Sequence, residues 1–324
     1  MIAIFLVSII TTVVFIELLR KSPIVNKGFM QHGVPAIGGL AIGAMFFIAA
    51  PLFLVRNGIF SKEGNGILLA SLVMLIFGVI DDKKNLSVIA KAITQIIAAL
   101  ILVIFGVRTH IIYIGTIANI IITLIWIIGI TNSFNHLDVM DGLAAFAAVI
   151  CLVSFLFLAM VKGDIFLFVL TTTLLGGLCG FLKYNLPEAK IYLGNTGSHF
   201  LGFILAGMAM VVHYAPMERK IALISPLLIL WLPIFDTAFV IFIRLIQGRS
   251  PFMKSNDHIA TRLLKMNLSK WQVLLLMSAW GLVCALLGVS LTYFNVITWP
   301  FLIVAVSILS VAVSLYAGRA VIND

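Results

Sequence analysis

The chain has 324 residues, of which 62% are hydrophobic and 10% charged, and its mean hydropathy is +1.20. No water-soluble domain of this length could carry so much apolar surface, so the composition excludes a soluble enzyme and predicts an integral membrane protein. Membrane topology and contact with anionic lipid explain the net charge of +9, which requires no nucleic acid partner.

Apolar runs long enough to cross a membrane predict the secondary structure. A hydrocarbon core of about 30 Å needs about 20 apolar residues per helix, and such unbroken runs are not typical of β-barrels. We predict an all-α polytopic bundle of about eleven membrane helices, forming one integral membrane domain over residues 1–324. The expected helices lie near residues 2–19, 36–55, 66–80, 88–106, 111–130, 142–161, 165–183, 198–213, 221–246, 272–292 and 297–317.

The positions of Lys and Arg predict the orientation of the chain. Arg20, Lys21 and Lys27 follow the first apolar run, and no small-residue cleavage site comes after it. The run is therefore expected to be a retained helix with its N-terminus outside. With eleven spans, fifteen of the 21 Lys and Arg residues fall in inside loops or the C-terminal tail. This bias predicts that the C-terminus also lies inside.

The first acidic cluster ends the third expected helix. Asp81 and Asp82 are adjacent carboxylates at a helix C-terminus, where the helix dipole disfavours negative charge unless a cation compensates it. Mg²⁺ and Lys91 are the candidate cations. Ser87 can cap the fourth helix, so that Lys91 and Gln95 lie one turn apart on a face that begins near the acidic pair. A hydrated loop that merely ends the span is the alternative interpretation.

The second cluster follows the fifth expected helix. Its members recur every three residues and are Asn132, Asn135, Asp138 and Asp141. Neighbours at this spacing lie on one side of a helical turn, so the row can curve around one ligand. Gly142 then allows the backbone to approach closely beside Asp141. Two amides and two carboxylates suit a nucleoside, a sugar or a metal ion, and a hydrated loop is again the alternative.

A polar patch, IYLGNTGSHFLG at residues 191–202, interrupts the apolar sequence before the eighth expected helix. Gly194 and Gly197 are expected to let the backbone turn sharply, with Ser198 capping the helix. The helix N-terminus would then face an anionic centre. Asn195 stands at the tip of the patch, where a turn that handles phosphate or metal more often carries a carboxylate.

Asp236 lies deeper than the other acidic residues, within LPIFDTAFVIFIRL. It precedes Arg244 by eight residues, which puts it about 12 Å inside the cytoplasmic end of the span. A carboxylate at that depth is costly and is usually functional or paired. Pro233 is expected to open the helix and free a carbonyl. The alternative is a structural role as the partner of a buried Lys or Arg.

The ninth loop concentrates positive charge. It carries five basic residues within seventeen positions, namely Arg249, Lys254, His258, Arg262 and Lys265. An anionic headgroup or a diphosphate would be attracted to this loop, although the positive-inside bias alone explains its lysines. His258 and Arg262 are spaced i,i+4, which makes them the specific candidates for phosphate binding.

Six motifs in order along the chain carry a family resemblance. They are HGVPAIGGLAIG at 32–43, DDKKNLSVIAKAITQ at 81–95, NSFNHLDVMDGL at 132–143, FLKYNLPEAKIYLGNTGS at 181–198, PIFDT at 233–237 and GRSPFMKSNDHIATRLL at 248–264. Together they resemble the polyprenyl-phosphate N-acetylhexosamine-1-phosphate transferases, relatives of the phospho-N-acetylmuramoyl-pentapeptide translocase. Chance agreement of six ordered motifs is not expected.

The resemblance implies transfer of a sugar 1-phosphate, such as GlcNAc-1-phosphate, from a UDP-sugar to undecaprenyl phosphate. UMP would be released, Mg²⁺ would be required, and Mn²⁺ would be its substitute. Such an enzyme is a multi-pass protein of the inner (cytoplasmic) membrane, faces the cytoplasm, and starts the synthesis of envelope glycans such as O-antigen or teichoic acid. Its partners would be UDP-GlcNAc or a similar UDP-N-acetylhexosamine, the polyprenyl phosphate, membrane lipids, and a second copy in a homodimer.

The resemblance also implies roles for individual residues. The catalytic residues would be Asp81, Asp82, Lys91, Asp138 and Asp141. The substrate-binding residues would be Asn135, Asn185, Asp236, Arg249, Lys254, His258 and Arg262. The metal ligands would be Asn195 and Asp82.

The chain departs from the family pattern at two places. The ninth loop keeps one His and the Arg, His258 and Arg262, of the usual His-x-His-His-Arg motif. Asn195 stands where the family's Gly-Asp-x-Gly-Ser motif has an Asp that binds Mg²⁺. An amide oxygen can coordinate Mg²⁺ but contributes no charge, so a lower metal affinity and rate are expected.

Three functions stay open on the sequence. The first is an active transferase, or one inactivated by an Asp-to-Asn change at residue 195 made to capture a substrate complex. The second is a naturally diverged, slow or inactive relative that still binds UDP-sugar or lipid phosphate. The third is a transporter or flippase for anionic lipid-linked sugars, which is disfavoured because the acidic residues crowd one interface rather than the bilayer midplane.

Overall fold

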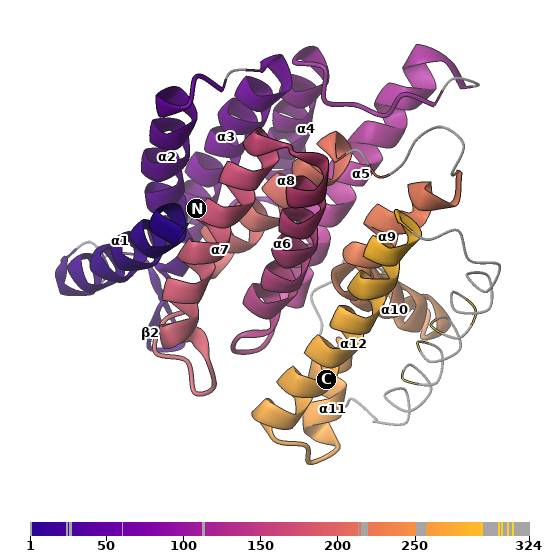
Figure 1. Ribbon diagram of the computed structural model, residues 1–324. Coiled ribbons are helices and arrows are strands. Elements are labelled where there is room, and N and C mark those ends of the chain that lie inside the picture. The colour runs from indigo at the N-terminus through magenta and orange to yellow at the C-terminus, as the bar shows by residue number, and fades with distance from the viewer. Residues whose placement is uncertain are drawn as a thin grey trace. The chain divides into compact units, whose positions relative to one another are not determined.

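The structure is a computed structural model with two compact units, which are described separately (Figure 1). The first unit comprises residues 1–135 and 155–212, and the second comprises residues 136–154 and 213–324. The described residues are 2–23, 25, 28–59, 61–111, 114–212, 214, 220–250, 257–293, 304, 306, 310 and 313.

Helices form most of the first unit. Its elements are α1 (Ile2–Lys21), β1 (Met30–Gln31), β2 (Val34–Pro35), α2 (Gly38–Arg56), α3 (Lys62–Lys84), α4 (Val88–Ile104), α5 (Gly115–Leu137), the end of α6 (Leu143–Lys162), α7 (Ile165–Asn185) and α8 (Gly194–Val211). The two short strands form an antiparallel hairpin. α8 packs against α2 and α3, while α7 packs against α1 and α2.

Two glycines bring α2 and α3 against the start of α8. A Cβ on Gly39 would overlap the backbone of Gly197, and a Cβ on Gly78 would overlap the backbone of Thr196. Such small residues let membrane helices approach at backbone contact distance. The polar start of α8 is therefore enclosed by α2 and α3.

The second unit is built on α12 (Lys270–Leu291). α12 packs against α9 (Ser225–Ile229), α10 (Trp231–Ile246) and α11 (Ile259–Lys265), and the short 3-10 helix η3 (Lys220–Ile224) precedes α9. The start of α6 also belongs to this unit.

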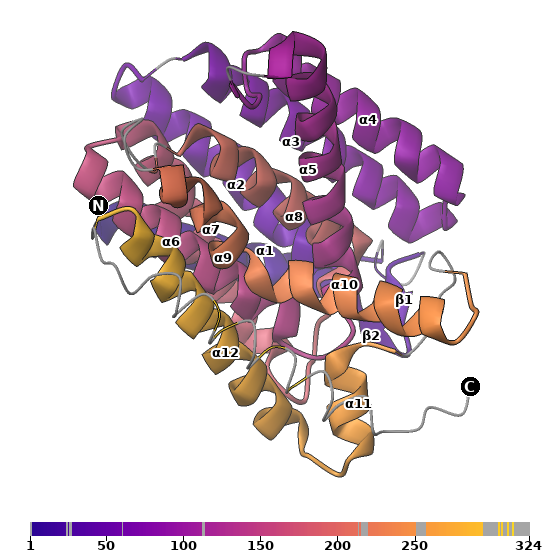
Figure 2. The same cartoon turned by 90° about the vertical axis from the view of Figure 1, so that its right-hand side faces the viewer.

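A sharp bend divides the span that was expected over 221–246. The segments 222–229 and 231–246 meet at 73° around Leu230 (Figure 2). The helix was expected to open at Pro233, three residues later, so the predicted position of the break is wrong. Pro233 lies in the first turn of α10, where the absence of its N–H leaves the carbonyl of Ile229 without a helical donor. The thiol of Cys151 donates to that carbonyl over 3.3 Å. The expectation that Pro233 frees a carbonyl is therefore confirmed.

The helices are those of a multi-pass membrane protein. In the described part of the chain, seven helices are long and apolar enough to span a membrane, and eight if the bent pair counts as one span. α4 is apolar but has only 17 residues. The all-α prediction is confirmed, while the count of eleven spans and the orientation stay predictions. The last expected helix, 297–317, lies largely outside the described residues.

Replacing Gly78 by Ala tests the close approach of α3 to α8. The added methyl group would meet the backbone of Thr196, and overpacking of this kind is expected to lower the free energy of unfolding by about 1–3 kcal/mol. Gly129→Ala is the matched control, because a Cβ there meets no atom within 4 Å. Thermal unfolding of the purified protein measures both. Equal midpoints for the two variants would contradict the packing.

Candidate functional site

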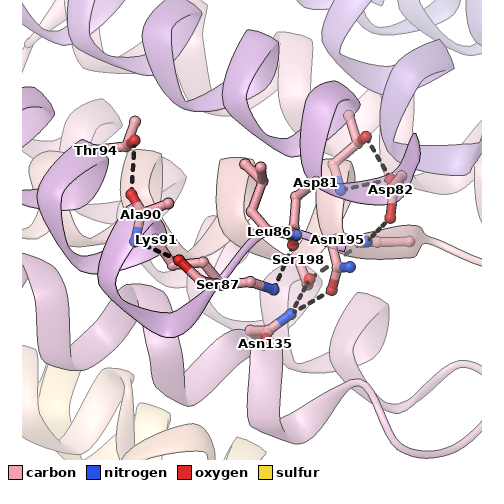
Figure 3. Close-up of polar contacts among 12 residues, drawn as sticks. Asp81, Asp82, Leu86, Ser87, Ala90, Lys91, Thr94, Asn135, Asn195 and Ser198 are labelled. Atoms are coloured by element: carbon pink, nitrogen blue, oxygen red, sulfur yellow. Dashed lines mark hydrogen bonds and ion pairs between the residues drawn. The ribbon is translucent and has the colours of Figure 1, made fainter. Parts of the chain in front are cut away.

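Four helices of the first unit are joined in a closed ring by polar side chains, most of which Figure 3 shows. One link joins each neighbouring pair: α3 to α4, α4 to α5, α5 to α8, and α8 back to α3. The residues that make these links are Asp81, Asp82, Lys91, Gln95, Asn132, Asn135, Asn195, Thr196 and Ser198. Sequence reasoning had given site roles to six of these nine, namely Asp81, Asp82, Lys91, Asn132, Asn135 and Asn195.

Asp81 and Lys91 form the link between α3 and α4. Nζ of Lys91 lies 2.5 Å from Oδ2 of Asp81, and the N–H of Leu86 donates to Oδ1 over 2.8 Å. The Asp81 side chain is fully buried, whereas that of Lys91 is 27% exposed. Ser87 caps α4 by accepting from the N–H of Ala90, as predicted. Lys91 is therefore the cation that compensates Asp81, and its side chain is the partly exposed member of the pair.

Asp82 forms the link between α3 and α8 and caps α8. Its Oδ1 accepts from the N–H of Asn195 over 2.8 Å, and its Oδ2 accepts from the N–H and the hydroxyl of Thr196 over 2.9 and 2.5 Å. A carboxylate here meets both the unpaired amides and the positive end of the helix dipole.

The expected cap by Ser198 is wrong. α8 begins at Gly194, four residues before Ser198, so this serine lies inside the helix. Its hydroxyl donates to the carbonyl of Gly194 over 3.1 Å. The N-terminus of α8 was expected to face the anionic centre of the site. In the structure it faces the carboxylate of Asp82, a residue far from α8 in the sequence, and a substrate phosphate near it stays a prediction.

Asn135 joins α5 to α8. Its Nδ2 lies 3.1 Å from Oδ1 of Asn195 and 2.9 Å from Oγ of Ser198, and it donates to both. Asn195 is half-buried. A carboxylate at this position could accept the same bond from Asn135, so the ring does not itself require a neutral group at residue 195.

A reciprocal pair of amides joins α4 to α5. Nε2 of Gln95 donates to Oδ1 of Asn132, and Nδ2 of Asn132 donates to Oε1 of Gln95, both over 3.0 Å. Gln95 is only 2% exposed. Asn132 was expected to belong to a ligand-binding row, but its side chain is hydrogen-bonded to Gln95 of α4. The sequence feature that indicated this pair was the position of Gln95, one turn beyond Lys91 on the same face of the helix.

Asn185 is buried at the end of α7. Its Nδ2 donates to the carbonyl of Ile191 over 2.9 Å, which holds together the ends of the loop that leads into α8. This hydrogen bond thus positions the loop that precedes Asn195.

In the second unit, Asp236 and His258 form a buried pair. Oδ2 of Asp236 lies 2.7 Å from Nδ1 of His258, while Oδ1 accepts from the N–H of Ile259 over 2.9 Å. The carboxylate thus anchors the first residues of α11. The alternative interpretation of Asp236 was a structural role as the partner of a buried Lys or Arg. Its observed partner is instead a histidine, His258. The ring of His136 lies edge-on to His258 at 6.2 Å between centroids.

The structure also locates the other charged residues of the second unit that were expected in the site. Arg262 is buried and donates to Oδ1 of Asp257 over 2.8 Å, and Nζ of Lys270 lies 2.9 Å from Oδ2 of Asp141. Asp138 is half-buried, and Arg249 is exposed just after α10. Lys254 lies outside the described residues. His258 and Arg262 are both on or beside α11, and each contacts a carboxylate.

The oxygen atoms near the start of α8 fit Mg²⁺ as an ion shared with substrate. Mg²⁺ prefers oxygen ligands and commonly binds through one or two carboxylates together with phosphates and water. Asp82 and Asn195 supply a carboxylate and an amide oxygen at one helix terminus. Among the described residues, no group of three His, Cys, Asp or Glu side chains could hold a metal ion by itself. The ion would therefore depend on phosphate ligands.

The chain is similar to proteins of one family. Residues 65–213, which contain the whole ring, match the family model described as glycosyl transferase family 4. A Bacillus subtilis protein named probable undecaprenyl-phosphate N-acetylglucosaminyl 1-phosphate transferase is 30% identical over 283 residues, covering 82% of this chain and 77% of that protein. A Mycobacterium tuberculosis decaprenyl-phosphate N-acetylglucosaminephosphotransferase is 32% identical over 295 residues, covering 81% and 73%.

A third relative acts on a different sugar, by its name. The phospho-N-acetylmuramoyl-pentapeptide-transferase of Streptococcus pneumoniae is 29% identical over 237 residues, covering 64% of this chain and 71% of that protein.

Substitution of the amide pair tests whether it holds α4 and α5 together. Gln95→Leu removes the donor to Oδ1 of the half-buried Asn132, whose Nδ2 keeps only its bond to the carbonyl of Ile128, and this is expected to lower the free energy of unfolding by about 1–3 kcal/mol. The double variant Gln95→Leu, Asn132→Leu removes both groups and is expected to cost less than the sum of the two single changes. Thermal unfolding of all four proteins measures this coupling. Additive losses would show that the pair does not stabilise the helix contact.

Proposed function

The chain belongs to glycosyl transferase family 4, among the polyprenyl-phosphate N-acetylhexosamine-1-phosphate transferases, and we propose that it transfers GlcNAc-1-phosphate from UDP-GlcNAc to undecaprenyl phosphate. The observation that carries this proposal is the ring of the first unit, in which the acidic pair, Lys91, Asn135 and Asn195 lie within one hydrogen-bonded network. The relatives are named as transferases, which favours this activity over transport of lipid-linked sugars.

The reaction joins two anions and therefore depends on charge neutralisation. An oxygen of the lipid phosphate forms a bond to the phosphorus that carries the sugar, and the bond from that phosphorus to UMP breaks. A phosphate monoester with a second pKa of about 6 is mostly dianionic at neutral pH, so its attack needs no strong base. Phosphoryl transfer is accelerated chiefly by positioning and electrostatic stabilisation.

The side chains of the first unit have distinct roles in this proposal. Asp81 is buried and holds Lys91, whose partly exposed side chain attracts the phosphate groups through its ammonium. Asp82 and Asn195 would hold Mg²⁺, or Mn²⁺ in its place, jointly with substrate phosphates. Such an ion would supply positive charge that neutralises the transferring phosphoryl group. Asn135 orients Asn195 and binds the nucleotide, and Asn185 positions the loop before them.

The second unit supplies further binding residues. Asp138 and Asp141 bind the nucleotide part of the donor, and Asp236 fixes the ring of His258 through Nδ1, so that Nε2 is the nitrogen available to a ligand. His258, Arg262, Arg249 and Lys254 bind the diphosphate. Both units work as one transferase domain over residues 1–324.

The cellular setting follows from the two substrates. One is dissolved in the lipid and the other in the cytosol, so the active site lies at the cytoplasmic face of the inner (cytoplasmic) membrane. The product starts the assembly of an envelope glycan. Contact with membrane lipids and a homodimer complete the proposed partners.

Reversion of Asn195 to Asp is the direct test of the proposed activity. The chain and its Asn195→Asp variant are incubated with radiolabelled UDP-GlcNAc, undecaprenyl phosphate and Mg²⁺. Because the carboxylate adds charge at the metal, lipid-linked sugar 1-phosphate and UMP are expected to form at least about tenfold faster with Asp. No product from either protein with any UDP-N-acetylhexosamine would contradict the proposal.

Substitution of Asp82 tests its proposed role as a metal ligand. In the Asn195→Asp background, Asp82→Ala removes the proposed metal ligand and is expected to abolish turnover. Thr196→Val is the control, because it removes one hydrogen bond to Asp82 and keeps the carboxylate; it is expected to retain most of the activity. Near-normal turnover of Asp82→Ala would remove this residue from the mechanism.

A further inference from the structure

A cavity lies at the end of the first unit remote from the ring. Its volume is about 550 Å³, within the range of roughly 300–1,000 Å³ typical of small-molecule sites. It is formed by the start of α1, the end of α2, the end of α6 and the start of α7.

The helix α2 shows how far this cavity lies from the ring. Gly39, at the start of α2, contacts the backbone of Gly197, two residues after Asn195. Arg56, at the other end of α2, lines the cavity. The 19 residues of α2 span about 28 Å, which is close to the thickness of the hydrocarbon core. The cavity and the ring therefore belong to opposite membrane surfaces.

The wall of the cavity is mainly apolar. The side chains that form it include Ile4, Phe53, Met160, Ile165, Phe168 and Val169. Ile4 and Val169 are buried, whereas Met160 and Ile165 are exposed, so the wall continues onto the surface of the unit. An apolar wall that opens beside apolar membrane helices suits an acyl chain.

The polar lining contains one cation and one carboxylate that do not neutralise each other. Arg56 is exposed and, within the part of the chain that the structure describes, makes no hydrogen bond or ion pair. Oδ1 of Asp164 accepts from the N–H of Leu167 over 2.9 Å, which caps α7. A guanidinium binds phosphate well, and a carboxylate attracts an ammonium group.

We propose that this cavity binds a zwitterionic phospholipid with a primary amine, of the phosphatidylethanolamine class. The phosphate lies at Arg56, the ammonium group at Asp164, and an acyl chain against the apolar wall. A headgroup with a net negative charge would meet the same arginine but would be repelled by Asp164. The site is separate from the proposed active site and does not depend on the transferase activity.

Native mass spectrometry of the full chain in detergent, titrated with dioleoylphosphatidylethanolamine or dioleoylphosphatidylglycerol, tests the proposal. The ethanolamine lipid is expected to bind about tenfold more tightly than the glycerol lipid. Arg56→Ala is expected to weaken its binding about tenfold, and Arg56→Lys to restore most of it. Asp164→Asn retains a capping side chain but is expected to abolish the preference between the two lipids.

The controls separate this site from general affinity for lipid. Lys162→Ala removes an exposed cation next to the cavity that is not part of its lining, and it is expected to leave both affinities unchanged. Glycerophosphoethanolamine, the headgroup without acyl chains, is expected to compete poorly. Equal affinity for the two lipids in the unmodified chain, unaltered binding by Arg56→Ala, or tight binding of the headgroup alone would each overturn the proposal.

Discussion

A polar side chain buried among membrane helices finds hydrogen-bonding partners only within the protein, because the hydrocarbon around it offers none. For the ring residues of the first unit this requirement is met by four links that close on themselves, from α3 through α4, α5 and α8 back to α3. Each link fixes the rotation of one helix against the next. Asp81, Asp82 and Lys91, three of the residues expected to be catalytic, are part of these links, so the bonds that hold the helices also orient these side chains.

The atoms at the start of α8 stabilise the helix and also take part in the proposed activity. A helix N-terminus favours an anion, and Asp82 provides one from within the protein. In the proposed mechanism Asn195 would hold Mg²⁺ jointly with Asp82. An amide oxygen contributes no charge, so the proposal predicts a weaker attraction for Mg²⁺ with Asn than with Asp at residue 195.

Local rules succeeded where a short segment decides its own conformation. Ser87 caps α4 and Pro233 frees the carbonyl of Ile229, as their sequence contexts predict. Local rules failed where a residue from a distant segment forms the hydrogen bond instead. Ser198 was expected to cap α8, but Asp82 takes that role from another helix, and Asn132 was assigned to a ligand row although it pairs with Gln95. The bend came at Leu230 rather than at Pro233, because proline is tolerated in the first turn of a helix.

The sequence by itself determined that the chain is an all-α membrane protein, because its composition and the length of its apolar runs leave no other stable arrangement in lipid. The six motifs, in their order along the chain, also identified the family, because each has particular residue types at fixed spacings. Only the tertiary structure decided which residues meet: that Lys91 pairs with Asp81, that Asp82 caps α8, and that Asp236 holds His258. Partners separated by tens of residues are chosen by helix packing, and no local spacing encodes that choice.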